Sequence, residues 1–294
     1  SMFRLREGKR KISLKLCFIG SIPDFNKSQF VFSFTAENGW HQLQTNQVSV
    51  AKAGNGEELH FDIEIANTAP AIFDFEPTIH GGQYQSKYPV FSILLKHDTV
   101  EKYAYSRWKN ARIDDIKMKV AAEGVRSLIF QNESSQLEAS KPFSPFGPIP
   151  AIGDHFYVGH QDIFNEKLES LNLNIKWKDI PELNFSTYYQ NYAVQPSNTA
   201  FKVNKALLDR KEWLSFNSES SIFHPQNAGL ISKIDFNLSD LSSIERKTTS
   251  QALDRWNYTV AHGFLRLTLS GPNIGGFRAF GHNLYNQAVR DNVN

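Results

Sequence analysis

The sequence predicts a mainly β protein with two β-rich, sandwich-like or jelly-roll-like domains, the second of which also contains a few short helices. Short segments in which apolar and polar residues alternate recur along the chain, as is typical of half-buried strands. Aromatic residues make up 13% of the chain, with 23 Phe, which favours strands and well-filled cores. A cluster of prolines near the middle separates the two β-rich halves.

The first half, residues 3–140, is predicted to be a β-sandwich domain because strand patterns follow one another without a strong helical period. Predicted strands cover residues 11–18, 30–35, 40–45, 59–66, 90–95, 116–120 and 125–131. Glu37-Asn38-Gly39 is a hairpin turn signal between the second and third of them. Only Ser92 interrupts the apolar run at 90–95, which is typical of a central strand buried on both faces.

Residues 141–150 are predicted to be a stiff, extended connector. The segment contains Pro142, Pro145, Pro148 and Pro150. Each proline fixes its own φ and lacks a backbone donor, so neither a helix nor a central strand can pass through. Phe143 and Phe146 are large apolar rings that a solvated linker does not need. We therefore expect them to hold the connector against an apolar surface, with Gly147 allowing a turn.

The second half, residues 151–294, is predicted to be a mixed β domain with short helices. Residues 161–170 have helical spacing, and a further helix is expected to begin near Asn283. Strand patterns cover residues 171–177, 234–238 and 265–269. Residues 207–213 fit either a short turn of helix or a strand, and the pattern leaves both open.

The bulk composition is that of a soluble globular protein. Hydrophobic residues make up 40% and charged residues 21%, with a net charge of +2. Positive and negative residues are interleaved, which gives no electrostatic reason to expect nucleic acid or an anionic membrane as partner. No apolar run approaches the roughly 18 residues that span a bilayer. Cys17 is the only cysteine, so no intrachain disulfide forms, and its place in a strand pattern predicts a small buried hydrophobe.

Candidate catalytic groups do not form a recognisable constellation. His155 and His160 lie at an expected strand-to-helix junction, but zinc needs a third and usually a fourth ligand. Asp62 and Glu64 face the same side of a strand, as a glycosidase pair could, but they also fit its solvated polar face. The sequence therefore predicts no catalytic residue, no metal site and no cofactor.

Several motifs resemble one known family. Residues 141–147 read KPFSPFG, a glycine then precedes Phe156-Tyr157, and an alternating strand ends at Trp177 before Pro181. In this order and spacing they resemble the large baseplate wedge protein of phage-tail-like contractile injection systems, of the antifeeding-prophage, baseplate J-like type. Residues 5–10 and 281–285 are similar too, so the resemblance extends over nearly the whole chain.

The resemblance implies a structural subunit of a baseplate, or an internal fragment of one because such proteins are usually longer, and no enzyme. Its partners would be other baseplate subunits, with assembly in the cytoplasm before incorporation into an injection particle, and the isolated chain would be a monomer or weak dimer. The candidate connector and interface residues are Pro142, Phe143, Pro145, Phe146, Gly147, Pro148 and Trp177.

The alternative interpretation is a carbohydrate-binding β-sandwich module or a glycan-acting enzyme. Its basis is the predicted fold and the aromatic content, since residues such as Trp40 and Tyr188 could stack on sugars. A deep cleft with converging carboxylates would favour this alternative, and broad apolar contact faces would favour the baseplate subunit.

Overall fold

The computed structural model describes residues 8–20, 22–82, 85–96, 107–148, 150–160, 168–180, 184–191, 195–209, 212–238, 251–253, 256–258 and 263–272. These residues form antiparallel sheets, with two short α-helices, α1 (Pro77–His80) and α3 (Phe185–Tyr188), and a few 3-10 turns. The predicted mainly β fold is confirmed. The chain divides into two compact units, Ser1–Arg126 and Ser127–Asn294.

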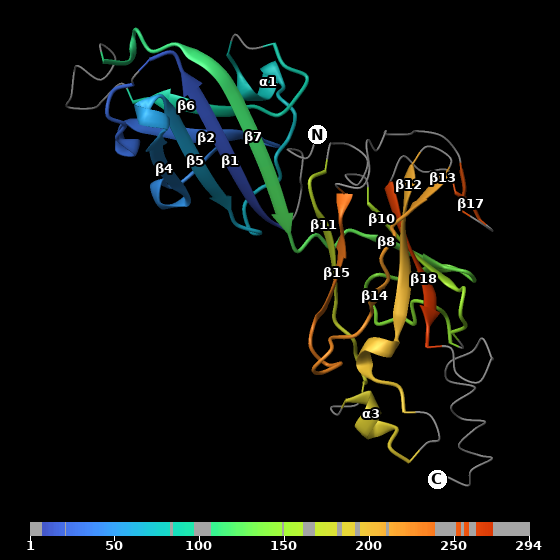
Figure 1. The fold of residues 1–294 in the computed structure, drawn as a ribbon. Helices are drawn as coiled ribbons and strands as arrows, with labels where there is room; N and C mark the ends of the chain where they lie inside the picture. Colours follow the sequence, from blue (N-terminus) through green and yellow to red (C-terminus); the bar gives the residue numbers. More distant parts are fainter. Residues whose placement is uncertain are drawn as a thin grey trace. The chain divides into compact units, whose positions relative to one another are not determined.

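The first unit is a β-sandwich (Figure 1). One sheet has the order β4 (Val48–Ala53), β5 (Glu58–Ile65), β1 (Lys9–Phe18), β7 (Ile113–Glu123). The other has the order β3 (Gly39–Gln42), β2 (Phe30–Ala36), β6 (Phe91–Leu95). Their apolar faces meet in a core, where the rings of Phe32 and Phe61 lie 6.0 Å apart. The alternation in β1 and β5 thus puts one face in the core and the other in solvent.

A buried arginine closes one end of this sandwich. The Arg10 side chain is fully buried and donates hydrogen bonds to the carbonyl oxygens of Ala66, Ala69 and Pro70, at 3.1–3.2 Å. Burial lowers the pKa of its guanidinium below the ordinary value. Three charge-assisted bonds offset that desolvation and hold the loop after β5 against the sheet.

The second unit is built on one larger sheet. Its strand order is β13 (Glu212–Ser215), β12 (Lys202–Asp209), β18 (Gly263–Gly271), β10 (His155–His160), β8 (Ile129–Asn132), β9 (Gln136–Leu137), with β14 (Ser220–Ser221) paired to β12. Two strand pairs accompany it, β11 (Leu171–Ile175) with β15 (Ser232–Phe236) and β16 (Gln251–Leu253) with β17 (Trp256–Tyr258). Gly159 faces Phe264 across β10 and β18, where a Cβ would overlap the phenyl ring.

Two strand interpretations are wrong and one ambiguity is resolved. Among the described residues, β6, expected to be central and buried on both faces, pairs with β2 alone and so lies at a sheet edge, where Leu94 is 54% exposed. The strand expected at 125–131 in the first half corresponds to β8, which pairs with β10 of the second unit. Residues 207–209 are strand in β12 and residues 212–213 are strand in β13; the two residues between them lie outside the described residues. Most of the helix expected at 161–170, and the one expected near Asn283, lie outside the described residues.

Candidate interaction groove

The proline-rich segment makes a tight turn in the second unit. The backbone N–H of Gly147 donates to the carbonyl oxygen of Ser144 at 3.1 Å, which closes a four-residue turn. Pro145 occupies the second position, where its fixed φ is favourable. Gly147 has φ +85°, with nothing within 4 Å of where a Cβ would lie. Backbone conformation, and not a lack of space, therefore favours glycine at this position.

Aromatic contacts hold this turn against the main sheet. Phe146 is 9% exposed and lies 6.0 Å from Phe156 of β10, ring centre to ring centre. Phe143 lies 4.9 Å from Phe130 of β8 and 5.9 Å from Phe156. Rings at these separations add to the stability gained from burial of their area. The segment that follows β9 is thus fixed by its own side chains to the two strands beside it.

The opposite wall comes from β11 and the residue pair that follows it. Leu173 and Ile175 are half-buried, and Trp177 lies 4.7 Å from the ring of Phe223. The indole N–H of Trp177 donates to the carbonyl oxygen of Ile222 at 2.8 Å. This hydrogen bond and the ring contact fix the orientation of Trp177.

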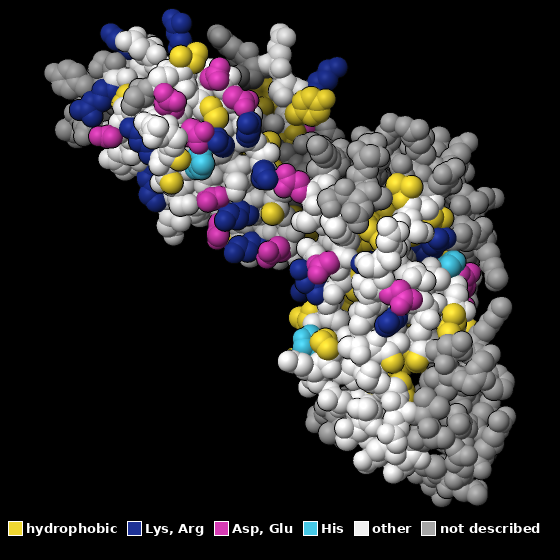
Figure 2. Space-filling model, viewed as in Figure 1, with side chains coloured by type: hydrophobic (Ala, Val, Ile, Leu, Met, Phe, Trp, Pro, Cys, Tyr) yellow, Lys and Arg dark blue, Asp and Glu magenta, His cyan; other side chains and the backbone are white. Residues whose placement is uncertain are grey.

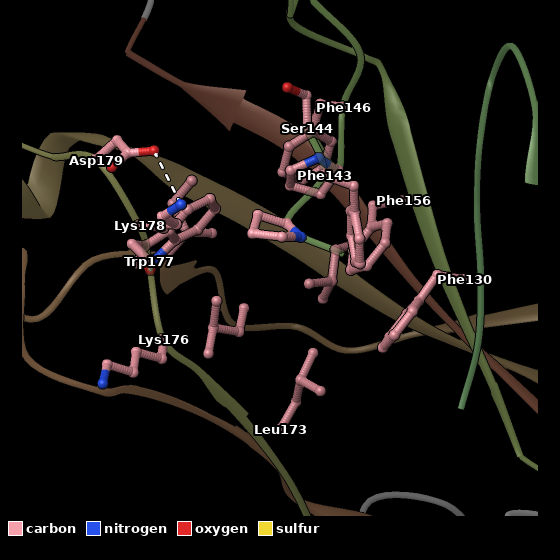
Figure 3. A pocket seen from close by; sticks show the side chains of 15 residues that line it. Phe130, Phe143, Ser144, Phe146, Phe156, Leu173, Lys176, Trp177, Lys178 and Asp179 are labelled. Atoms are coloured by element: carbon pink, nitrogen blue, oxygen red, sulfur yellow. Dashed lines mark hydrogen bonds and ion pairs between the residues drawn. The ribbon is translucent and has the colours of Figure 1, made fainter. Parts of the chain in front are cut away.

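Between these walls lies an open pocket with a volume of about 540 Å³. Figure 3 shows the rings of Phe143, Phe146 and Phe156 on one side and Trp177 with Lys178 on the other. Lys178 and Asp179 form an exposed ion pair of 3.8 Å at the rim. The surface is therefore an apolar and aromatic groove with charged groups at its edge, and we call it the Pro–Trp groove.

The structure brings together most of the residues that the sequence singled out. Pro142, Phe143, Pro145, Phe146 and Trp177 all line the Pro–Trp groove. Gly147 and Pro148 do not line it; Gly147 instead shapes the turn. The sequence pattern contained no signal that the proline-rich segment and Trp177 share one groove, because their proximity depends on the pairing of β11 with β15.

Comparison with known proteins identifies the family. The sequence matches the family described as Baseplate protein PVC11-like over residues 1–293. The chain belongs to the PVC11-like baseplate protein family. A search of curated proteins found no match. Membership of the PVC11-like family agrees with the resemblance to baseplate proteins that the motifs indicated.

The carboxylates considered for catalysis in this PVC11-like protein contact side chains of the neighbouring strand β1. Asp62 accepts a hydrogen bond from the Ser13 hydroxyl at 2.6 Å and lies 3.8 Å from the Lys11 amino group. Glu64 lies 3.4 Å from the amino group of Lys9. These are cross-strand contacts on the solvent face of a sheet.

The two histidines considered for metal binding are the first and last residues of β10, and most of the helix expected after His160 lies outside the described residues. Their separation of five residues directs them to opposite faces of the strand. The Nδ1 atom of His155 is 3.0 Å from the Thr268 hydroxyl on β18. Among the described residues, no group of three or more His, Cys, Asp or Glu is arranged to hold a metal ion.

Sequence reasoning missed one polar residue that joins two sheets of the second unit. Lys205 lies in β12 and is 5% exposed, with the Phe216 and Phe236 rings 5.9 and 5.8 Å from its amino group. Its amino group donates to the Asp235 carbonyl oxygen at 2.8 Å. Burial lowers the pKa of Lys205, against the opposing attraction of the Asp235 carboxylate. In the part of the PVC11-like chain that the structure describes, the helices lack the length and apolarity of a membrane span.

Proposed function

We propose that this baseplate protein is a structural subunit of a phage-tail-like contractile injection system, or an internal part of one, of the large wedge, baseplate J-like type. The single observation that supports the proposal most is the match to Baseplate protein PVC11-like over residues 1–293. The KPFSPFG motif and the alternating residues that end at Trp177 support the finer assignment to the large wedge protein.

The chain would act by holding neighbouring subunits and not by catalysis. The Pro–Trp groove has the apolar, aromatic lining and charged rim that are typical of protein–protein contacts. We assign it as a contact site for another baseplate subunit. The protein would assemble in the cytoplasm and then form part of the injection particle, and the isolated chain would be a monomer or weak dimer.

Carbohydrate binding is the second candidate function, and the aromatic lining of the Pro–Trp groove favours it. Sugar-binding sites use aromatic faces together with hydrogen-bonding side chains. Here the Trp177 indole lies against Phe223, and its N–H is bonded to Ile222. A glycan array with the intact chain, repeated with Trp177→Ala, tests this candidate; binding that depends on Trp177 would favour it over the contact site.

Assembly of particles in the producing cell tests the structural role. Deleting residues 3–294 from the parent protein should abolish complete particles in electron micrographs. Pro142→Arg, at an exposed position in the groove, should reduce the particle count without altering the melting temperature of the isolated chain. Pro148→Arg is the matched control, because Pro148 is exposed in the same segment but lies outside the groove. Normal particles after the full deletion would contradict the structural role.

A further inference from the structure

We propose that residues 124–127 form a hinge on which the two compact units turn relative to one another, with Gly124 as the pivot. The hinge is a property of the isolated chain and does not rest on the proposed function. Its consequence does rest on it, since a hinged subunit would keep each unit bound to its own neighbour while a contractile particle rearranges.

The first observation is that the chain passes between the units once. The units are Ser1–Arg126 and Ser127–Asn294. Among the described residues, every sheet lies wholly within one unit, and so does each of the two hydrophobic cores. Relative motion is the default expectation for two units of one chain, unless a large apolar interface fixes them.

The second observation is that the first unit holds its end of the linking segment firmly. Glu123, the last residue of β7, pairs with Lys9 of β1. A Cβ on Gly8 would lie 2.5 Å from the Glu123 carbonyl oxygen, so the start of β1 and the end of β7 are in close contact. The backbone N–H of Gly8 donates to the side-chain oxygen of Asn67 at 2.9 Å. The chain is therefore fixed as far as Glu123.

The second unit holds the other end of the segment. Leu128 packs against the core of that unit, and Ile129 begins β8 and pairs with Gly159 of β10. The next ring along β8, that of Phe130, stacks 5.8 Å from Phe156 of β10. Residues 124–127 therefore lie between two fixed points, and they belong to no strand or helix.

The third observation is the conformational freedom of Gly124. Its φ is +75°, which side chains other than that of glycine disfavour, and nothing lies within 4 Å of where a Cβ would be. Gly8 has a similar φ of +86° but is crowded by Glu123. Hinges are a few loop or element-terminal residues that absorb changes in φ and ψ. Gly124 follows the end of β7 directly, in open space, and so fits this role.

The sheet that ends in β7 has a solvated face of its own. Figure 2 shows Lys and Arg side chains (dark blue) interleaved with Asp and Glu (magenta) over the first unit. Pairs such as Lys15 and Glu58, 2.7 Å apart, form between strands of this one sheet. Charged side chains of this kind stay in water, so this face favours hydration over burial against the second unit.

Distances between spin labels on the purified chain test the hinge. Cys17, the only cysteine, is first replaced with serine, and labels are attached at Ala51→Cys on β4 and Asn172→Cys on β11, both exposed positions. The reference pair is Ala51→Cys with Ala121→Cys, which lie in one sheet. We expect a distance distribution about twice as wide between positions 51 and 172 as for the reference pair. A distribution no wider than the reference would overturn the hinge.

Two matched glycine substitutions test the pivot. Gly124→Ala disfavours a φ near +75°, so the distribution between positions 51 and 172 should shift its mean or narrow. Gly20→Ala is the control, because Gly20 is exposed within the first unit, has φ +81° and has nothing within 4 Å of a Cβ position. It should leave the distribution unchanged. Equal effects of the two substitutions, or no effect of Gly124→Ala, would overturn the pivot.

The hinge and the structural role fail separately. Both glycine variants should keep the melting behaviour of a folded chain, because an added methyl group meets open space at each position. A wide distribution together with normal particles after deletion of residues 3–294 would support the hinge and contradict the structural role. A narrow distribution would overturn the hinge whatever the particle count shows.

Discussion

The Nζ atom of Lys205 on β12 lies 2.8 Å from the carbonyl oxygen of Asp235 on β15, so one buried side chain joins the main sheet to the β11–β15 pair. The aliphatic stem of a lysine can pack among apolar groups while its amino group binds. Lys205 is only 5% exposed, so its amino group binds the Asp235 carbonyl instead of reaching water.

We predict that Lys205→Met destabilises the protein by about 1–3 kcal/mol, because the Asp235 carbonyl loses its charged donor in a part-buried position. Urea unfolding measures the change. Lys202→Met on the same strand is the control, since Lys202 forms an exposed pair with Glu219 at 3.4 Å and should cost less than about 0.5 kcal/mol. Equal effects of the two substitutions would show that the bond to Asp235 contributes nothing.

The pKa of Lys205 gives a second prediction, on alkaline pH. Burial lowers this pKa in the folded state, while the unfolded chain keeps the ordinary value of about 10.4. Between the two values the unfolded state binds more protons, so the contribution of this group to stability rises with pH. The stability difference between the protein and Lys205→Met should therefore grow as pH rises toward about 10.4. Unfolding curves at several pH values measure it, and a difference that shrinks would contradict the sign.

The turn at residues 144–147 gives a third prediction. Phe146→Ala should cost about 3 kcal/mol or more, because Phe146 is 9% exposed and part of the core of the second unit. Ser144→Ala, at an exposed position of the same turn, should cost less than about 0.5 kcal/mol. Thermal or urea unfolding measures both. A loss below about 1 kcal/mol for Phe146→Ala would mean that the segment is not held by this ring.

The fourth prediction concerns acid pH. Hydrogen bonds from Lys15, and then from His60, lower the pKa of Glu58 in the folded protein. The resulting stabilisation is present above the unfolded pKa of about 4.3 and is lost as pH falls through the lower folded value. Glu58→Gln should therefore reduce the acid-side loss of stability. Unfolding measured from pH 6 down to about pH 3 tests this, and an unchanged acid profile would contradict it.

Local patterns predicted the strands well because alternation is a property of neighbouring residues. β1, β5 and β11 were predicted in this way, and in each of them every second side chain lies on a face that is at least partly buried. The run at 90–95 shows the limit of this reasoning. An apolar run does not reveal its place in the sheet order: in the part of the chain that the structure describes, β6 lies at an edge with Leu94 exposed.

The residues of the candidate site were predicted from the sequence, but their arrangement in one groove was not. The prolines and phenylalanines predicted a stiff, extended connector held against an apolar surface, with Gly147 allowing a turn. The groove also includes Trp177, which the pairing of β11 with β15 positions. Lys205 gave no local signal, because its acceptor lies thirty residues further along the chain. The position of β7 at the end of its sheet, among the described residues, is likewise a property of sheet order, which the sequence pattern did not predict.

The fifth prediction concerns independent folding of the two units. The core of the first unit and the core of the second share no residue, since their buried members lie within 12–72 and 146–269. Phe61→Ala, in the first core, should therefore reduce the free energy of unfolding of one transition by about 3–5 kcal/mol and leave the other transition unchanged. Leu207→Ala should do the reverse, and the double variant should be additive. Calorimetry of the single and double variants measures this, and one shared transition would contradict it.

Two fragments of the chain test where the boundary between these units lies. The sequence placed it at residues 141–150, whereas contacts place it after Arg126. A fragment of residues 127–294 keeps β8 and the ring of Phe130, which stacks 5.8 Å from Phe156. A fragment of residues 151–294 loses that strand together with Phe143 and Phe146, so the β8-facing edge of β10 and the Phe156 ring would be uncovered. We expect the longer fragment to unfold cooperatively and the shorter one to aggregate, as judged by circular dichroism and light scattering. Cooperative unfolding of both would instead favour the boundary at the prolines.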